Sequence, residues 1–263
     1  MYSFEIDRPA TLAEALAALT EEGAQALGGG QTLIPTLKAR LAAPARLVSL
    51  AGIAALRGVE MEGGRLSVGG GTTHATVARE AAAHYPALAA LAARIGDPAV
   101  RNRGTIGGSL ANDDPSACYP AGVLASGATI LTDRREIAAD DFFQGLFTTA
   151  LEEGEIITRV LFPVPERARY EKMLQPASRF PLAAVFVAKF AGGVRVAVTG
   201  ASADGVFRWT GAEDALSRDF SKAAVERLEP PPADGMIGDI HGSPDYRAHL
   251  VRVLSGRAVA NAG

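Results

Sequence analysis

The chain has 263 residues, a length that fits one large domain or two smaller ones. Hydrophobic residues make up 48% of it and charged residues 21%, which excludes a disordered chain because disorder requires few apolar residues and a high net charge. The net charge of −3 gives no long-range attraction for a polyanion, so nucleic acid is not an expected partner.

Cysteine usage and the apolar runs limit the cofactors and the location. Cys118 is the only cysteine, so the chain can hold no internal disulfide, no four-cysteine zinc site and no iron–sulfur cluster of its own. No uninterrupted apolar run reaches the length of about 18 residues that a membrane span needs. Glu5 and Asp7 stand where a secretion signal requires basic and then apolar residues. We expect a cytoplasmic protein without a membrane span.

The first third of the chain predicts short strands and helices joined by glycine triplets. Thr11 and Glu14 form a capping box ahead of a leucine-rich stretch, which is typical of a helix start. Two predicted strands run directly into glycine triplets, at 28–30 and at 69–71, and a predicted helix follows each triplet. The similarity around the triplets is limited to GGG-x-T, which is weak support for an internal duplication. In chain order the predicted elements are a helix over 11–20, a strand over 24–27, a helix over 33–41, strands over 47–50 and 66–68, and a helix over 73–83.

A third glycine cluster, at 104–108, lies in a segment that consists almost entirely of turn-forming and small polar residues, 102–120. Apolar structure resumes at 121–127 and again at 129–131, so the sequence predicts a long loop held between ordered elements. Ordered loops of this length usually carry function.

The last third of the chain has a different pattern, with strands first and helices after them. This order is typical of a separate α+β domain, and we place its boundary near residues 163–166. The three prolines 230–232 end a helix because proline lacks the N–H that a helix requires. The predicted elements are strands over 155–162, 168–174, 183–190 and 194–199, and helices over 212–216, 222–228 and 245–259.

Glycine is both frequent and clustered. Its 29 residues are about 11% of the chain, against a usual share of about 7%. A loop without side chains lets backbone N–H groups approach a ligand, and such loops bind a diphosphate without Lys or Arg. Gln31 and Thr32 add neutral donors to the first loop, and the segment 105–109 places donors on both sides of a glycine pair. We expect two glycine loops to bind one pyrophosphate, although a tight turn is the alternative for any single triplet.

Several common sites are absent from the sequence. There is no G-x-x-x-x-G-K-[ST] motif and no G-x-G-x-x-G with a following acidic residue, which excludes P-loop enzymes and ordinary Rossmann dehydrogenases. Cys118 has no base or positive charge near it in the sequence, so we expect burial or a cofactor contact and not a nucleophile. The four histidines lack the spacing of metal ligands, so we expect no metal site and place them on the surface. They are His74, His84, His241 and His249.

Three stretches of the chain read ALGGGQTLIPTLKARLAAPARLVSL, VGGGTTHATVA and IGDPAVRNRGTIGGSLANDDPSACYPA. In this order the chain closely resembles the FAD-binding medium subunit of the molybdenum hydroxylases, the family that includes the carbon monoxide dehydrogenase and xanthine dehydrogenase types. The motif YEKM at 170–173 and the strand–helix tail extend the resemblance over nearly the whole chain.

The resemblance implies an α+β protein. Residues 1–165 are expected to form the two-subdomain FAD-binding fold of the vanillyl-alcohol-oxidase (PCMH) type, with α/β subdomains over about 1–55 and 56–165. Residues 166–263 are expected to form a smaller α+β domain, an antiparallel sheet with helices.

The resemblance also implies residues that bind FAD without a covalent bond. Ile95 and Ile157 fall where the family places apolar side chains against the flavin. Lys172 matches a flavin-proximal lysine, whose charge would stabilise the anionic reduced flavin. The residues that match the family's two pyrophosphate loops are Gly28, Gly29, Gly30, Gln31 and Thr32 in the first, and Thr105, Ile106, Gly107, Gly108 and Ser109 in the second.

One position departs from the family's pattern D-P-x-x-D-x-P, because Cys118 stands where many members carry the second aspartate. A carboxylate there would accept hydrogen bonds from ribityl or ribose hydroxyls, and a thiol is a weaker partner. We expect this contact to be weaker here or to be made by Asp113 or Asp114.

By resemblance the chain is the FAD-binding electron-transfer subunit of a molybdenum-containing hydroxylase or dehydrogenase. The implied partners are a small subunit with 2Fe–2S clusters and a large molybdopterin subunit, in a dimer of heterotrimers. Electrons would pass from the clusters to FAD and on to an external acceptor. Two alternatives are open at this point: a self-sufficient FAD oxidase of related fold, and a nucleotide-binding subunit without catalysis.

Overall fold

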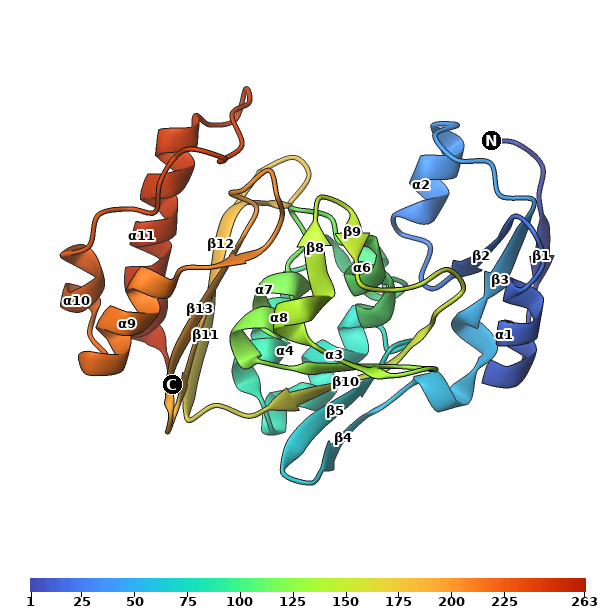
Figure 1. Ribbon diagram of the computed structural model, residues 1–263, viewed down its shortest axis with the longest axis horizontal. Coiled ribbons are helices and arrows are strands. Elements are labelled where there is room, and N and C mark those ends of the chain that lie inside the picture. The colour runs from blue at the N-terminus through green and yellow to red at the C-terminus, as the bar shows by residue number, and fades with distance from the viewer.

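The computed structural model describes residues 1–263 and contains three main sheets that follow one another along the long axis of the molecule, together with a small two-stranded sheet (Figure 1). The N-terminal sheet is parallel, and the central and C-terminal sheets are antiparallel. Helices are distributed over all three parts, so the expected α+β class is confirmed.

The N-terminal unit is a three-stranded sheet in the order β1-β3-β2 with two helices. Its first helix begins at the predicted capping box. Thr11 Oγ1 accepts a hydrogen bond from the amide of Glu14, and the Glu14 carboxylate accepts one from the amide of Ala10. The elements are β1 (Glu5–Asp7), α1 (Leu12–Leu19), β2 (Ala24–Leu27), α2 (Leu33–Lys38) and β3 (Arg46–Ser49).

Helix α2 is shorter than the leucine spacing predicts, and the expectation that it reaches Leu41 is wrong. The chain leaves the helix at Ala39, and Arg40 takes a left-handed backbone with φ of 61°. Leu41 is consequently 80% exposed and packs on no helix face.

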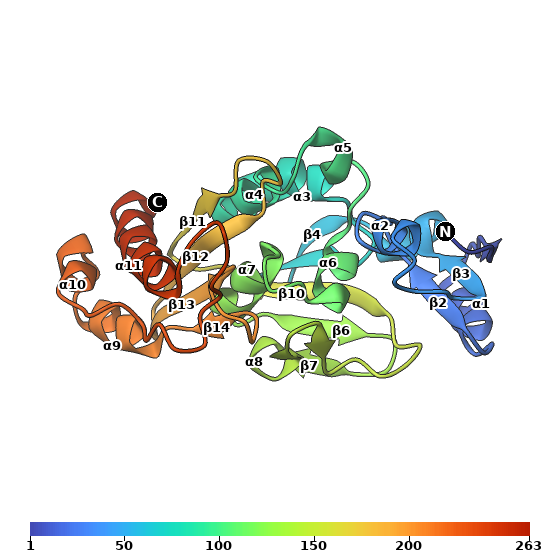
Figure 2. The same cartoon turned by 90° about the horizontal axis from the view of Figure 1, so that it is seen from above.

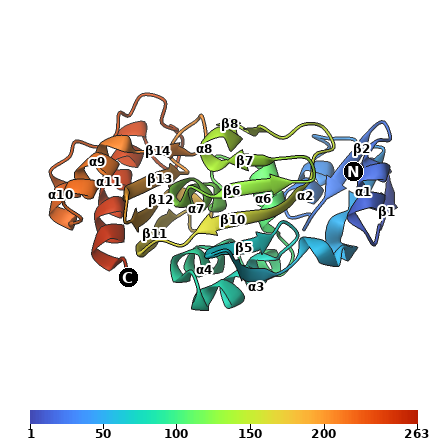
Figure 3. The same ribbon diagram turned by 60° about the horizontal axis from the view of Figure 1, so that its bottom comes forward.

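The central unit is a five-stranded sheet in the order β4-β5-β10-β6-β7, and Figure 3 shows β5, β10, β6 and β7 side by side. Its helices form the largest buried cluster together with one face of the sheet. Strands and hairpins are β4 (Val59–Glu62), β5 (Arg65–Gly69), β6 (Thr129–Thr132), β7 (Glu136–Ala138), β8 (Phe143–Gly145), β9 (Thr148–Thr149) and β10 (Ile157–Pro163). Helices are α3 (His74–Glu80), α4 (Pro86–Ala93), α5 (Pro98–Arg101), α6 (Ile106–Asn112), α7 (Tyr119–Ser126) and α8 (Ala139–Phe142), with short 3-10 turns at Leu50–Gly52, Ala54–Leu56 and Ala81–Ala83.

The segment 102–120 is not the long loop that its composition predicts. Thr105 caps a helix through its hydroxyl, which accepts the amide of Gly108, and α6 therefore runs through the glycine pair. Glycine disfavours helix interiors, which is why composition alone pointed to a loop. The predicted helix over 73–83 is likewise divided, because α3 ends at Glu80 and a 3-10 turn follows.

The C-terminal part is an antiparallel sheet covered by helices on both faces (Figure 2). Strand β12 shows the arrangement: Ala184 and Phe186 belong to the core of the central unit, whereas Val185 and Val187 belong to the core under the C-terminal helices. This alternation fixes β11 and β12 against the central helices. The elements are β11 (Arg167–Leu174), β12 (Pro181–Phe190), β13 (Gly193–Thr199), β14 (Phe207–Arg208), α9 (Thr210–Arg218), α10 (Lys222–Glu226) and α11 (Pro244–Asn261). None of the helices combines the length and the apolar character that crossing a bilayer requires.

Candidate cofactor-binding site

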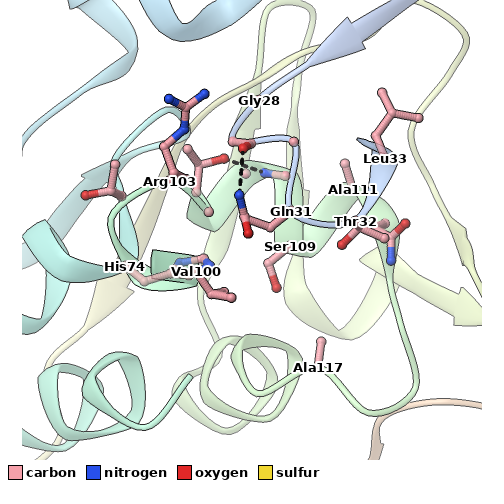
Figure 4. A pocket seen from close by; sticks show the side chains of 18 of the residues that line it. Gly28, Gln31, Thr32, Leu33, His74, Val100, Arg103, Ser109, Ala111 and Ala117 are labelled. Atoms are coloured by element: carbon pink, nitrogen blue, oxygen red, sulfur yellow. Dashed lines mark hydrogen bonds between the residues drawn. The ribbon is translucent and has the colours of Figure 1, made fainter. Parts of the chain in front are cut away.

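A cleft of about 820 Å³ lies where the three parts of the molecule meet. Its walls come from the end of β2, the starts of α3 and α6, and the hairpin between β11 and β12. Figure 4 labels Gly28, His74 and Ser109 from the first three of these walls. Ile106 is the one predicted binding residue that does not line it, because its side chain is fully buried in the central core. The predicted residues that do line the cleft are Gly28, Gly29, Gly30, Gln31, Thr32, Ile95, Thr105, Gly107, Gly108, Ser109, Cys118, Ile157 and Lys172.

Glycines allow the three loops around the cleft to pack backbone against backbone. The three loops carry the glycine clusters at 28–30, 69–71 and 104–108. A Cβ on Gly29 would lie 2.0 Å from the carbonyl oxygen of Arg103, so the first loop can pack against the third only if position 29 has no side chain. A Cβ on Gly107 would lie 2.7 Å from the carbonyl oxygen of Gly70, so the third loop meets the second in the same way. These two glycines hold the loops together and thereby shape the cleft.

The first loop, 28–32, supplies free donors. None of its five backbone amides donates a hydrogen bond to another protein group. The Gln31 side-chain amide makes only a 3.5 Å contact to the carbonyl of Gly29, and the Thr32 hydroxyl has no partner. In Figure 4 Gln31 and Thr32 lie on the rim of the space that Ser109 borders. Such a run of unpaired N–H groups on side-chain-free backbone suits an anionic group.

The third loop, 105–109, differs, because most of its backbone amides already donate to protein groups. Ile106 donates to Thr72 O at 3.1 Å, Gly107 to Gly70 O at 2.8 Å, and Gly108 to Thr105 Oγ1 at 3.2 Å. That both loops bind one pyrophosphate stays a prediction, and the two loops differ in how many backbone donors they leave without a protein partner. The donors of this loop without a protein partner are the amide of Thr105 and the hydroxyl of Ser109, and both residues line the cleft.

His74 corrects the expectation of four surface histidines. Three of them are exposed, but His74 is 4% exposed, lines the cleft and packs against the ring of Tyr119 at 5.3 Å between centroids. Burial, helped by the charge of Arg101, lowers its pKa to about 4, and Nδ1 is buried without a hydrogen-bond partner. The imidazole is thus neutral at pH 7. The sequence signal for it was its place directly after the second triplet and the Thr73 cap.

Cys118 also has a neighbour that its sequence context did not reveal. Lys172, 54 positions later, places Nζ 3.5 Å from Cys118 Sγ at the cleft wall. The sequence shows no positive charge near this thiol, because Lys172 on β11 meets Cys118, the N-cap residue of α7, only in the fold.

The two aspartates before Cys118 are placed differently from one another. Asp114 lines the cleft and accepts the amide of Ser116 at 2.8 Å. Asp113 does not line the cleft; it is 1% exposed, has a left-handed backbone with φ of 42°, and neither carboxylate oxygen has a partner. Burial, with the charge of Asp114, raises its pKa to about 7. Of the two, only Asp114 can reach a ligand in the cleft.

The donor set fits FAD. The run of free amides at 28–32 matches a diphosphate, Ile95 and Ile157 supply apolar surface for a ring system, and the ammonium of Lys172 supplies a positive charge beside it. The chain holds no set of three or more His, Cys, Asp or Glu side chains arranged for a metal ion. Arg103, Arg179 and Phe180 also line the cleft, and no motif in the sequence pointed to them.

Comparison with known proteins agrees with this geometry. A family model described as "FAD binding domain in molybdopterin dehydrogenase" matches residues 2–165. The nicotine 6-hydroxylase medium subunit of Paenarthrobacter nicotinovorans is 36% identical over 97% of this chain and 95% of that protein. The carbon monoxide dehydrogenase medium chain of Afipia carboxidovorans is 34% identical over 99% of this chain and 96% of that protein.

Solved structures resemble the chain over almost its full length. A Cu,Mo-containing CO dehydrogenase aligns with a TM-score of 0.89 and 32% identity, covering 98% of this chain and 97% of that one. Quinoline 2-oxidoreductase from Pseudomonas putida 86 aligns with a TM-score of 0.88 and 30% identity, covering 98% and 96%. The chain therefore belongs to the family of FAD-binding medium subunits of the molybdenum hydroxylases, and it is a flavoprotein component of an oxidoreductase.

Proposed function

We propose that FAD lies non-covalently in the cleft and relays electrons from an iron–sulfur partner subunit to an external acceptor. The observation that carries the proposal is the row of five unpaired backbone amides at 28–32, which faces the same cleft as Ile95, Ile157 and Lys172. When bound, the flavin supplies the redox chemistry.

In this proposal each part of the cleft has one task. The amides at 28–32 hold the diphosphate, with Gln31, Thr32 and Ser109 as side-chain donors. Ile95 and Ile157 exclude water from the ring, and Lys172 provides the positive charge beside it. Ile106 is left out of this set, since it supports the loop from the core.

The partners are proposed as a small 2Fe–2S subunit and a large molybdopterin subunit, in a dimer of heterotrimers in the cytoplasm. The relatives are named as medium chains or subunits, which supports an assembly of several chains. The single cysteine supports it as well, because clusters must then be held by another chain.

Purification of the tagged full chain from its own host tests the proposal. We expect it to bring down a 2Fe–2S protein and a larger molybdenum-containing chain, and denaturation should release free FAD. Substrate oxidation by this chain alone, without molybdenum or iron, would favour a self-sufficient oxidase. A chain that binds FAD but neither takes up nor passes on electrons would be a nucleotide-binding subunit without catalysis.

A further inference from the structure

The ammonium group of Lys172 lines the cleft without a carboxylate partner. The residue is 7% exposed, and Nζ donates to the Arg94 carbonyl at 3.0 Å and to Cys118 Sγ at 3.5 Å. Lys172 forms no salt bridge, and the neighbouring Glu171 is paired with Arg169 at 2.9 Å and lies 3.7 Å from Arg94. A buried lysine is usually paired with an acid, so this arrangement leaves a positive charge uncompensated.

The other groups around Lys172 add no negative charge. The Arg94 guanidinium donates to the carbonyls of Tyr170 and Lys172 and lies 5.7 Å from the centroid of the Tyr170 ring. The hydroxyls of Tyr119 and Tyr170 are buried without hydrogen-bond partners, and burial keeps both phenols neutral by raising their pKa. Burial, together with the charge of Arg94, lowers the pKa of Lys172, and the hydrogen bond to Cys118 Sγ opposes that shift. Cys118 is thus the one side chain that hydrogen-bonds to the Lys172 ammonium.

We propose that Cys118 is a positioning residue for Lys172: its sulfur, with the Arg94 carbonyl, holds the ammonium at the cleft wall while leaving its charge free to interact with the reduced flavin. This inference rests on the proposal that FAD lies in the cleft with its ring beside Lys172. It reassigns Cys118 from a sugar contact to the lysine that it touches.

The charge balance gives the reason. Two electrons and one proton convert neutral oxidised flavin into an anion, so the site gains one negative charge. An aspartate at position 118 would form an ion pair with Lys172 and cancel the charge that favours this anion. A thiol accepts a hydrogen bond without cancelling it. The cysteine therefore keeps the flavin easier to reduce than an aspartate would.

The test is the midpoint potential of FAD bound to the full chain, measured by dye-mediated titration from neutral to alkaline pH. The variants are Cys118→Ala, Cys118→Ser as the conservative control, Lys172→Met, and the double variant Cys118→Ala with Lys172→Met. Bound FAD is quantified in each sample before titration. Lys172→Met should make reduction at least tenfold less favourable, which for a two-electron couple is about 30 mV.

Cys118 should act only through the lysine. In the wild type, reduction of FAD is accompanied by protonation of Lys172 over a limited pH range. Within that range the midpoint potential falls more steeply with increasing pH. Cys118→Ala should move this range to lower pH, Cys118→Ser should leave it near its place, and Lys172→Met should abolish it. If Cys118→Ala changed the midpoint potential equally in the wild-type and in the Lys172→Met background, the inference would be overturned. The proposal that FAD binds in the cleft would still stand. A wild-type chain that takes up no FAD would overturn the proposed site as well.

Discussion

The triplets at 28–30 and 69–71 share the pattern GGG-x-T, but their backbones are used in opposite ways. In the first, the amides of 28–32 have no protein partner. In the second, the amides of 69–72 donate to Gly58, Thr158, Leu56 and Gly69 at 2.7–3.0 Å. The amides of the first triplet are available to a ligand, and those of the second form hydrogen bonds within the fold.

Both triplets are closely packed, since a Cβ on Gly29 would lie 2.0 Å from the carbonyl oxygen of Arg103. A Cβ on Gly70 would lie 2.1 Å from the carbonyl oxygen of Ile157, and one on Gly69 would lie 2.5 Å from that of Leu56. A Cβ on Gly28 would meet the Thr105 hydroxyl at 3.0 Å, a tight but adjustable contact. The comparison teaches that a repeated glycine motif can leave its amides without a protein partner at one place and use them within the fold at another, although both triplets pack closely against backbone.

The largest expected effect is that of Gly70→Ala. The new Cβ meets backbone that cannot move without disturbing β10, so we expect the free energy of unfolding to fall by more than about 3 kcal/mol, with or without FAD. Denaturant unfolding of the full chain measures this. Gly58→Ala is not a neutral control because Gly58 has φ of 122°, so Gly192→Ala, where the Cβ meets open space, is the matched one. If Gly70→Ala were as stable as the wild type, the second triplet would not be needed for close backbone packing, and the comparison would fail.

The helix after the second triplet begins with the buried His74, which makes this region sensitive to acid. Its folded pKa of about 4 lies below the usual 6.5, so between these values the unfolded chain binds a proton that the folded chain excludes. The free energy of unfolding should fall by up to about 3 kcal/mol as the pH drops from 6.5 to 4, with no such effect above pH 6.5. Unfolding curves of His74→Gln, which lacks this group, should show a correspondingly weaker acid dependence; identical curves would show that His74 does not titrate in this way.

Gly108→Val tests ligand access at the cleft. Gly108 is exposed, and a Cβ there meets only the Thr105 hydroxyl, at 3.0 Å, so the branched side chain should project into the cleft. We expect FAD affinity to fall about tenfold to a hundredfold, about 1.4 to 2.8 kcal/mol, while the protein without FAD still folds. Calorimetric titration with FAD measures it, and Gly108→Ala should lie between wild type and valine. Unchanged affinity would mean that FAD does not pass over this loop.

The smallest effect is expected at the cap of α6. Thr105→Ala removes the acceptor for the Gly108 amide and should cost about 1 kcal/mol of stability, whereas Thr105→Ser should keep it. Because the cap faces Gly28, a loss of FAD affinity larger than the loss of stability would show that it also orders the first loop.

Local sequence signals predicted much of the fold. The capping box at Thr11, the apolar strands of the C-terminal sheet and the proline stop at 230–232 depend on near neighbours, and the corresponding elements are present. The extent of α2 and the helical state of 106–112 were missed, since they depend on a left-handed Arg40 and on a cap that outweighs glycine's low helix propensity.

The site was predictable as a set of segments but not as a set of contacts. The resemblance named thirteen residues that line the cleft, because motifs preserve which loops meet. Which amides are free, the burial of His74 and the approach of Lys172 to Cys118 depend on residues far apart in the chain, and no local pattern encodes them.

Amide hydrogen exchange with and without FAD tests the central claim most directly. Without FAD, the amides of 69–72 should already be protected by their hydrogen bonds, and those of 28–32 should exchange fast. On FAD binding, 28–32 should become protected and 69–72 should change little. FAD binding that leaves exchange at 28–32 unchanged would contradict the assignment of the first triplet to the diphosphate.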